Sequence, residues 1–454
     1  MATTYLTRTG VTPTISNKYT FSCWVKRGSI GTTETIFRTY SDSNNSAQLI
    51  FDSDDSFAFQ DIIGGTTVTN LKPSNLFRDP GAWMNIIVQV DYTQATAADR
   101  AKIFINGVEV SYSATTVQSE GGASMLNTAN NNALGSNRSN SSHYFTGSMS
   151  QVNFIDGTAY PATAFGSVNA TSGIWVANSG PTVTYGNNGF FLDMANSSDM
   201  GNDVSGKTND FTVGGGTVTQ MEDTPDNNFA TLNPLYVINA SEMPTLTNGN
   251  TTGTSTSSGY NSGVASIAPA GSGKYYSEHK LISGTGGWAT NTYLGYNQTP
   301  SASPTSAPHD TNFFYGVLAD GGAREGATNK AGYAGTWTSG DIIQLALDLD
   351  NNRLYVGKNG LWADGSGNWD EANINAYINL AASPAVAGEN WFMMCGDKNT
   401  STATWGNNFG NGHFGTTAVT TNSGNGYAGA EGKSIFNYQP PTGYSALSTK
   451  GLNL

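Results

Sequence analysis

The sequence contains few charged residues. Asp, Glu, Lys and Arg together make up 12% of its 454 residues, about half their share in average soluble proteins. The formal net charge is −13, and only 20 Lys and Arg residues are spread over the whole chain. Because contacts with a phosphate backbone require clustered basic side chains, this distribution predicts no nucleic-acid partner.

Cysteine is almost absent as well. Cys23 lies in the apolar run Phe21–Val25, and Cys395 ends the run Trp391–Cys395. Both positions predict buried free thiols. Two cysteines in different halves of the chain provide no disulfide framework that would indicate an oxidising compartment.

Long apolar runs are missing too. No stretch reaches the roughly 18 apolar residues of a membrane-spanning helix, so we expect no membrane insertion. Residues 1–8 contain no basic segment followed by an apolar one, which predicts no secretory signal. If the protein acts at a surface, it must leave the cell without a signal or a membrane span, and lysis of the host by a virus is one such route.

Glycine, aromatic residues and alternating apolar patterns are what the sequence does contain. There are 55 glycines, and aromatic residues make up 11% of the chain. Turns are therefore abundant, and the aromatic side chains provide the apolar area that a folded core needs. Since the length exceeds that of a single typical core, we expect two domains.

Residues 1–175 are predicted to form short strands. Apolar side chains occupy the odd positions of residues 19–25, and this period of two is the signature of a strand. Asn106–Gly107 is the preferred sequence of a two-residue hairpin turn, because both positions tolerate positive φ. That turn would pair Ile105 with Val108.

A second strand-rich region is predicted over residues 264–438, where Leu345, Leu347 and Leu349 alternate with smaller or polar residues. Residues 176–263 are interpreted as a connecting segment with short strands and a polar linker. Consecutive prolines predict an extended tail over residues 439–454. Residues 375–378 are the one place where we expect a helical turn.

The first region resembles laminin-G or concanavalin-like jelly rolls. The pieces that carry this resemblance are Phe21–Val25, Trp83–Asp91, Ile103–Val110 and Phe145–Phe154. Each is a common β pattern alone, and their order and spacing make the set more specific. The resemblance implies a β-sandwich.

The second region is similar to SPRY domains. Gly340–Asn352 continues into Leu354–Leu361, which reproduces that family's Gly-Asp pair, alternating strand, Asp-Asn turn and Lys-Asn-Gly turn. Lys274–Glu278 resembles an early strand of the same family. The predicted fold class is therefore all-β, with two β-sandwich domains (jelly-roll, concanavalin-like and SPRY-like) joined by an irregular segment.

The arrangement as a whole resembles structural proteins of marine tailed phages that join these two modules. The pieces Ser150–Ala159, Gly189–Asp193, Asp223–Asn228 and Pro440–Leu447 carry this resemblance. It implies a virion structural protein at the virion surface, either a tail fibre, a knob or a capsid decoration. Its expected partners are other virion proteins, further copies of the chain in a trimer, and a host-surface glycan or protein.

Two other functions stay open at this point. A free carbohydrate-binding lectin is the second interpretation, and a glycoside hydrolase is the third. Hydrolases of concanavalin-like fold place paired carboxylates on alternate positions of one strand. Asp348 and Asp350 alternate, but the SPRY resemblance assigns them to a structural turn. We therefore predict a protein that is not an enzyme.

One acidic cluster could bind a metal ion. Asp52, Asp54 and Asp55 lie together, and carboxylate oxygens at this spacing suit a hard cation such as calcium. The alternative is a solvated acidic turn between two strands. No other cofactor is expected, because the four histidines are widely separated and the sequence has no nucleophile or phosphate-loop motif.

Aromatic side chains are the remaining candidates for ligand contact, since sugar rings stack on them. The ones that flank Gly-rich loops of the second region are Trp337, Trp362, Tyr293 and Tyr333. We expect at least one of them to contact a ligand or a neighbouring protein. The alternative for each is packing in the core.

Overall fold

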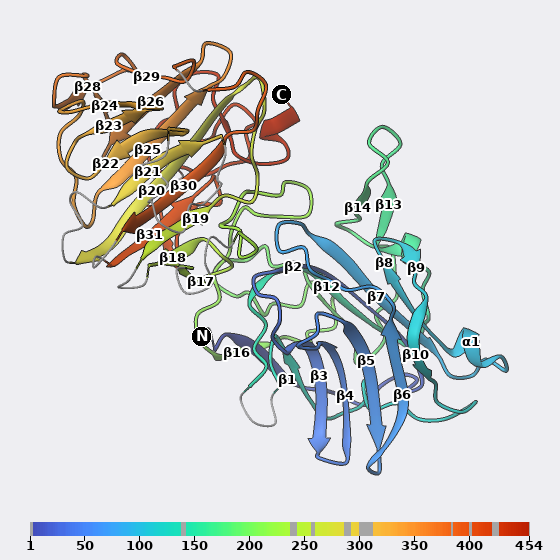
Figure 1. Ribbon diagram of the computed structural model, residues 1–454. Helices are drawn as coiled ribbons and strands as arrows, with labels where there is room; N and C mark the ends of the chain where they lie inside the picture. The colour runs from blue at the N-terminus through green and yellow to red at the C-terminus, as the bar shows by residue number, and fades with distance from the viewer. Residues whose placement is uncertain are drawn as a thin grey trace. The chain divides into compact units, whose positions relative to one another are not determined.

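The computed structural model describes residues 3–137, 142–236, 243–255, 259–285, 292–298, 312–382, 385–398, 402–419 and 426–453. The chain divides into two compact units, Met1–Gln220 and Met221–Leu454. Each unit consists of sheets whose strands are mainly antiparallel (Figure 1). The predicted all-β fold class is confirmed: within the described residues, α-helix is limited to α1 (Ala97–Arg100). No helix in these ranges is long and apolar enough to cross a membrane.

The first unit contains two large sheets. One has eight strands in the order β10 (Tyr112–Thr116), β6 (Thr66–Pro73), β5 (Phe57–Ile63), β4 (Asn45–Phe51), β3 (Glu34–Asp42), β11 (Asn131–Leu134), β1 (Tyr5–Thr9) and β16 (Thr212–Gly215). The other has six, in the order β15 (Phe190–Leu192), β12 (Gly147–Asp156), β2 (Lys18–Arg27), β7 (Met84–Asp91), β8 (Ala101–Ile105) and β9 (Val108–Glu109). A short hairpin adds β13 (Gly166–Val168) and β14 (Trp175–Ala177).

The two large sheets of this unit share one apolar core. Tyr19, Phe21, Cys23 and Val25 all point into it, which confirms the alternation predicted for β2. The rings of Phe21 and Phe37, one from each sheet, stack with centroids 5.3 Å apart.

The predicted hairpin turn of this unit is also confirmed. Asn106 and Gly107 have φ values of 48° and 78°, and Ile105 pairs with Val108. This turn requires a left-handed backbone at both positions, and Asn and Gly are the residues that adopt it most readily.

The second unit has a ten-stranded sheet. Its main path is β17 (Thr245–Thr247), β18 (Thr252–Thr254), β31 (Thr402–Asn408), β20 (Lys274–Thr285), β25 (Ile342–Asp348), β26 (Arg353–Lys358), β27 (Leu361–Ala363) and β28 (Trp369–Glu371). β29 (Ile378–Asn379) pairs with β26, and β34 (Ser445–Ala446) pairs with β20.

A six-stranded sheet completes the second sandwich. Its order is β19 (Tyr260–Val264), β30 (Phe392–Lys398), β21 (Tyr293–Asn297), β22 (Phe314–Leu318), β23 (Ala323–Glu325) and β24 (Thr328–Lys330). β32 (His413–Phe414) and β33 (Thr417–Ala418) form a separate hairpin. Leu345 and Leu347 pack with Leu294 and Tyr296 in the core between the sheets. On the other face of β25, Ala346 belongs to a second cluster with Tyr276, Phe436 and Tyr444.

The predicted helical turn at residues 375–378 is wrong. Ile378 pairs with Leu354 as part of β29, and its side chain is buried in the core. Strand pairing therefore determines the backbone where local sequence suggested a turn of helix.

The predicted connecting segment, residues 176–263, contributes to both units. It supplies β15 and β16 to the first unit and β17 and β18 to the second. Residues 237–242 and 256–258 of this segment lie outside the described residues.

Each unit is closed by contacts between its beginning and its end. In the first unit, β1 pairs with β16. In the second, Ala230 donates a 2.9 Å backbone hydrogen bond to the carbonyl of Leu447, and Phe229 forms a β-bridge with Ser448.

Candidate functional site

The two faces of the eight-stranded sheet differ in chemistry. Side chains alternate between the faces along each strand, so the register assigns rows of residues to one face or the other. The inner row packs in the core and consists of Leu6, Leu134, Phe37, Leu49, Phe59 and Leu71. The adjacent row, on the outer face, is called the polar row here and consists of Thr7, Ala133, Arg38, Gln48, Gln60, Asn70 and Thr116. The row therefore crosses β1, β11, β3, β4, β5 and β6 and reaches β10, with a hydrogen-bonding side chain on each strand except β11, where Ala133 stands.

The centre of the polar row is a ladder of amides. Nε2 of Gln48 donates a 2.9 Å hydrogen bond to Oε1 of Gln60. Oε1 of Gln48 and Oδ1 of Asn70 are buried and have no hydrogen-bond partner within the described ranges. An unsatisfied buried acceptor costs roughly 1–3 kcal/mol, so either oxygen would gain from a donor, which can reach it only when the half-buried side chain rotates toward the surface.

Arg38 and Tyr40 lie at one end of this ladder. The Arg38 guanidinium is 5.1 Å from the centroid of the Tyr40 ring. It donates to Asn137 Oδ1 and to Ser46 Oγ, while its Nε is buried without a partner in the part of the chain that the structure describes. Burial lowers the pKa of Arg38. This pair therefore places the half-buried Tyr40 ring beside the Arg38 Nε–H group, which has no hydrogen-bond partner within the described segments.

The three central rows of this face contain no carboxylates. The rows on either side of the polar row consist of Thr9, Asn131, Tyr40, Ser46, Ile62 and Thr67, and of Thr35, Ile50, Ala58 and Lys72. Together with the polar row they contain no Asp or Glu. Glycoside hydrolysis requires a pair of carboxyl groups across the scissile bond, and these three rows contain no such pair.

Asp52, Asp54 and Asp55 are engaged by cationic side chains. Lys72 Nζ lies 3.6 Å from Asp52 and 3.2 Å from Asp54. Asp55 points inward, where it pairs with Arg27 at 3.2 Å and Arg78 at 3.0 Å.

The environment of Asp55 also accounts for its ionisation. Burial opposes the charge, but the Gly31 amide and the guanidinium groups of Arg78 and Arg27 lower the pKa of the Asp55 carboxyl. Among the described residues, no group of three or more His, Cys, Asp or Glu side chains is placed to hold a metal ion. The carboxylates at this turn are balanced by the protein's own cations.

The aromatic side chains singled out from the sequence are buried in the second unit. Their exposed fractions are 1% for Trp337, 5% for Trp362, 0% for Tyr293 and 4% for Tyr333. Tyr293 and Trp362 belong to β21 and β27, and Tyr333 and Trp337 pack in the core cluster of the second sandwich. The expectation that at least one of the four contacts a ligand or a neighbouring protein stays a prediction. Trp337 Nε1 donates to the carbonyl of Leu318 at 3.0 Å. Of the four, Tyr333 lines an open cleft, which is described below.

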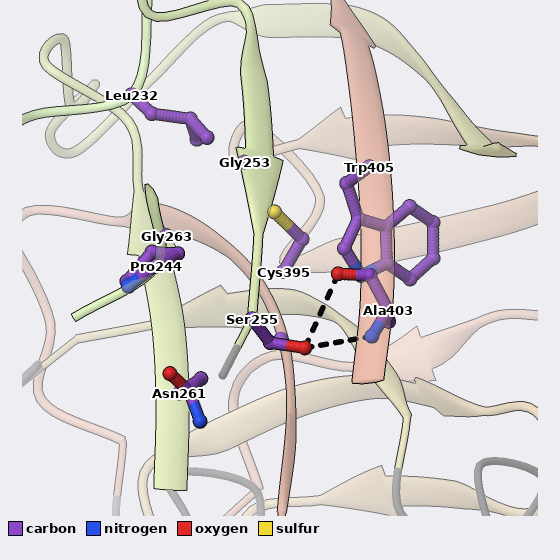
Figure 2. A pocket seen from close by; sticks show the side chains of 10 residues that line it. Leu232, Pro244, Gly253, Ser255, Asn261, Gly263, Cys395, Ala403 and Trp405 are labelled. Carbon is purple, nitrogen blue, oxygen red and sulfur yellow. Dashed lines mark hydrogen bonds between the residues drawn. The ribbon is translucent and has the colours of Figure 1, made fainter. Parts of the chain in front are cut away.

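A small internal cavity of the second unit contains no candidate site. Figure 2 shows it between β18, β19, β30 and β31, with Ser255, Cys395 and Trp405 in its lining. Its volume of about 10 Å³ is at the limit for one water molecule. Burial raises the pKa of the Cys395 thiol to about 12, so this thiol is not a nucleophile at neutral pH.

Comparisons with known proteins agree with the fold of the first unit. Residues 2–164 match the laminin-G model of the Concanavalin A-like lectin/glucanases superfamily, as the resemblance of this region predicts. No curated protein matches the chain.

Several solved structures are similar in fold. The SPRY domain of human HERC1 is 15% identical, with a TM-score of 0.26, over 38% of this chain and 90% of that chain. A putative carbohydrate binding protein from Bacteroides ovatus is 15% identical, with a TM-score of 0.34, over 47% of this chain and 56% of that one. Domains LG4-5 of the mouse laminin alpha1 chain are 8% identical, with a TM-score of 0.28, over 88% of this chain and 85% of that one. At these values the likeness concerns the fold alone.

Proposed function

We propose that this chain is a non-catalytic, lectin-like protein that binds a glycan on the polar row of its first unit. The carbohydrate-binding type of fold in residues 2–164 suggests lectin-like binding. The observation that carries the proposal to this face is the amide ladder, in which Gln48 and Asn70 each retain a buried acceptor without a partner in the described structure.

The chemistry of the face favours a sugar. Each sugar hydroxyl both donates and accepts, so it can bond to the half-buried amides of Gln48, Gln60 and Asn70 once these side chains turn toward it. Tyr40, half-buried beside Arg38, offers a ring for stacking. Binding without cleavage follows from the lack of carboxylates in the three rows defined above.

The test is glycan-array binding by the full chain and by a variant with both Gln48→Ala and Gln60→Ala. We expect the double variant to lose about tenfold or more in affinity, since two hydrogen-bonding side chains are removed. Asn187→Ala is the matched control, because Asn187 is an exposed amide outside the polar row. Equal binding by all three proteins would refute the proposal, and release of reducing sugars from a polysaccharide would restore the hydrolase interpretation.

The biological setting that we propose is the surface of a tailed-phage virion, where the chain serves as a tail fibre, a knob or a capsid decoration. The support is the sequence resemblance to phage structural proteins. In this setting its partners are other virion proteins, further copies of itself in a trimer, and a host-surface glycan or protein. Co-purification with intact particles tests the setting, and analytical ultracentrifugation of the 47.7 kDa chain tests the trimer. A free monomer that binds glycans would favour a lectin that acts outside any particle.

A further inference from the structure

The second unit has an open cleft that the function above does not use. Its volume is about 460 Å³, which is within the range of small-molecule sites. The cleft lies beyond the end of β24 and beside the segments that flank β28. Its lining consists of Lys330, Ala331, Tyr333, Gly365, Asn375, Ala376 and Tyr377.

Tyr377 provides an exposed aromatic ring at this cleft. The residue is 39% exposed. The Arg353 guanidinium lies 4.5 Å from its ring centroid, and the Tyr355 ring packs edge-on at 6.1 Å. These two contacts hold the ring in place while more than a third of the residue stays accessible. Such a fixed ring loses little conformational entropy when a ligand stacks on it.

The polar groups of the cleft carry little net charge. Lys330 forms an ion pair with Glu325. Oε2 of Glu325 also accepts a 3.1 Å hydrogen bond from the backbone amide of Asn379. An ammonium group has three donors, so Lys330 can bond a ligand while it keeps this ion pair. Asn375 adds an amide to the same lining.

Tyr333 forms part of the wall. Tyr333 is 4% exposed, and its hydroxyl oxygen, Oη, is buried and has no hydrogen-bond partner among the described residues. The Lys330 ammonium lies 5.9 Å from its ring centroid. Because Oη is itself buried, Tyr333 contributes the edge of its ring to the wall, and its hydroxyl takes no part in the proposed contacts.

We propose that this cleft is a second carbohydrate site, which takes a pyranose ring of a neutral oligosaccharide. The ring stacks on Tyr377, and its hydroxyls bond to Lys330 and Asn375. A neutral sugar is favoured because Glu325 already balances Lys330 and would repel the carboxylate of an acidic sugar. The site belongs to the second unit and depends on no residue of the polar row.

The experiment uses the full chain with Gln48→Ala and Gln60→Ala as the parent, so that the binding measured belongs to the second unit. The probes are an array of neutral oligosaccharides and one of oligosaccharides that contain uronic acid, followed by calorimetry with the neutral sugar that binds best. Tyr377→Ala should weaken binding about tenfold, and Tyr377→Phe, which keeps the ring, by less than about threefold. Leu361→Ala changes an exposed side chain outside the lining and should have no effect.

The second site would be overturned if no neutral oligosaccharide binds to the parent, or if Tyr377→Ala binds like Leu361→Ala. Binding of the acidic array alone would also overturn it. Circular dichroism of each variant separates a lost site from a lost fold. The polar-row proposal fails separately, if the unsubstituted chain and the parent bind the same glycans equally well.

Discussion

The carboxylate of Glu278 accepts a 2.7 Å hydrogen bond from the backbone amide of Tyr438, 160 residues further along the chain. Glu278 lies on β20 and is fully buried. It also accepts from the Asn437 amide at 2.8 Å, the Tyr276 hydroxyl at 3.0 Å and the Asn408 amide at 3.2 Å. One side chain thereby fastens the C-terminal segment over the outer face of the ten-stranded sheet.

Glu278→Gln should destabilise the protein by ~2–4 kcal/mol. The substitution replaces one acceptor oxygen with an amino group that faces two donors, and each unsatisfied buried group costs ~1–3 kcal/mol. Burial raises the pKa of Glu278 to about 7, so the measurement is chemical denaturation of the full chain at pH 8 or above, where this carboxyl is ionised. Glu389→Gln is the control, because Glu389 is exposed in the same unit. Similar denaturation midpoints for the two variants would mean that Glu278 does not hold the segment.

Asp397 should make stability depend on pH. Burial raises the pKa of this carboxyl to about 7, although the Ser255 hydroxyl lowers it in part. The folded state therefore binds the proton more tightly than the unfolded state, where the pKa is about 4. The contribution of Asp397 to the unfolding free energy is complete below about pH 4 and is lost as the pH rises through 7.

The test compares the unfolding free energy of the natural chain with that of Asp397→Asn between pH 5 and pH 8. We expect the natural chain to gain more stability than the variant as the pH falls across this range. His279 contributes with the opposite sign, since burial lowers its pKa to about 4, but it is common to both proteins. Parallel pH profiles would contradict the prediction.

Gly107→Ala should cost more stability than Gly121→Ala. Both glycines have positive φ, 78° and 71°, so both substitutions strain the backbone by roughly 1 kcal/mol. A Cβ at Gly107 would overlap the ring of Trp175, whereas nothing lies within 4 Å of one at Gly121. The overlap adds ~1–3 kcal/mol. Thermal unfolding of both variants checks the difference, and equal losses would show that the Trp175 ring moves aside freely.

Calcium at millimolar concentration should leave the melting temperature unchanged. Both oxygens of Asp55 are already bound by guanidinium groups, and Lys72 competes for Asp52 and Asp54. Melting curves with calcium and with a chelator provide the comparison. A rise of several degrees with calcium would restore the metal site that the spacing of these aspartates suggests.

The fold could be predicted well wherever local sequence and strand pairing agree. The alternation in residues 19–25 and the Asn106–Gly107 turn each determine a local backbone geometry, and the structure contains both. Residues 375–378 were predicted incorrectly because their conformation depends on pairing with Leu354. That partner lies outside any local window of the sequence.

The candidate sites were much harder to predict than the fold. The polar row brings together Arg38, Gln48, Gln60 and Asn70 from four strands, and each is an ordinary polar position within its own strand. A single glutamine in the middle of each of β4 and β5, Gln48 and Gln60, was the available signal, but only the register places the two side by side. Aromatic composition indicated Trp337, yet it cannot distinguish a core ring from an exposed one such as Tyr377.

The pairing of first and last strands has a consequence for synthesis. β1 has no place in its sheet beside β16 until about residue 215 has been made, and Ala230 has no partner until Leu447 has been made. β1 is already paired with β11 on its other side, so what stays open on the ribosome until about residue 215 is the edge of β1 that β16 covers. A chain that ends before Ser445 would lack β34 and the Leu447 carbonyl, and it would leave β20 and Ala230 without these partners and exposed to aggregation.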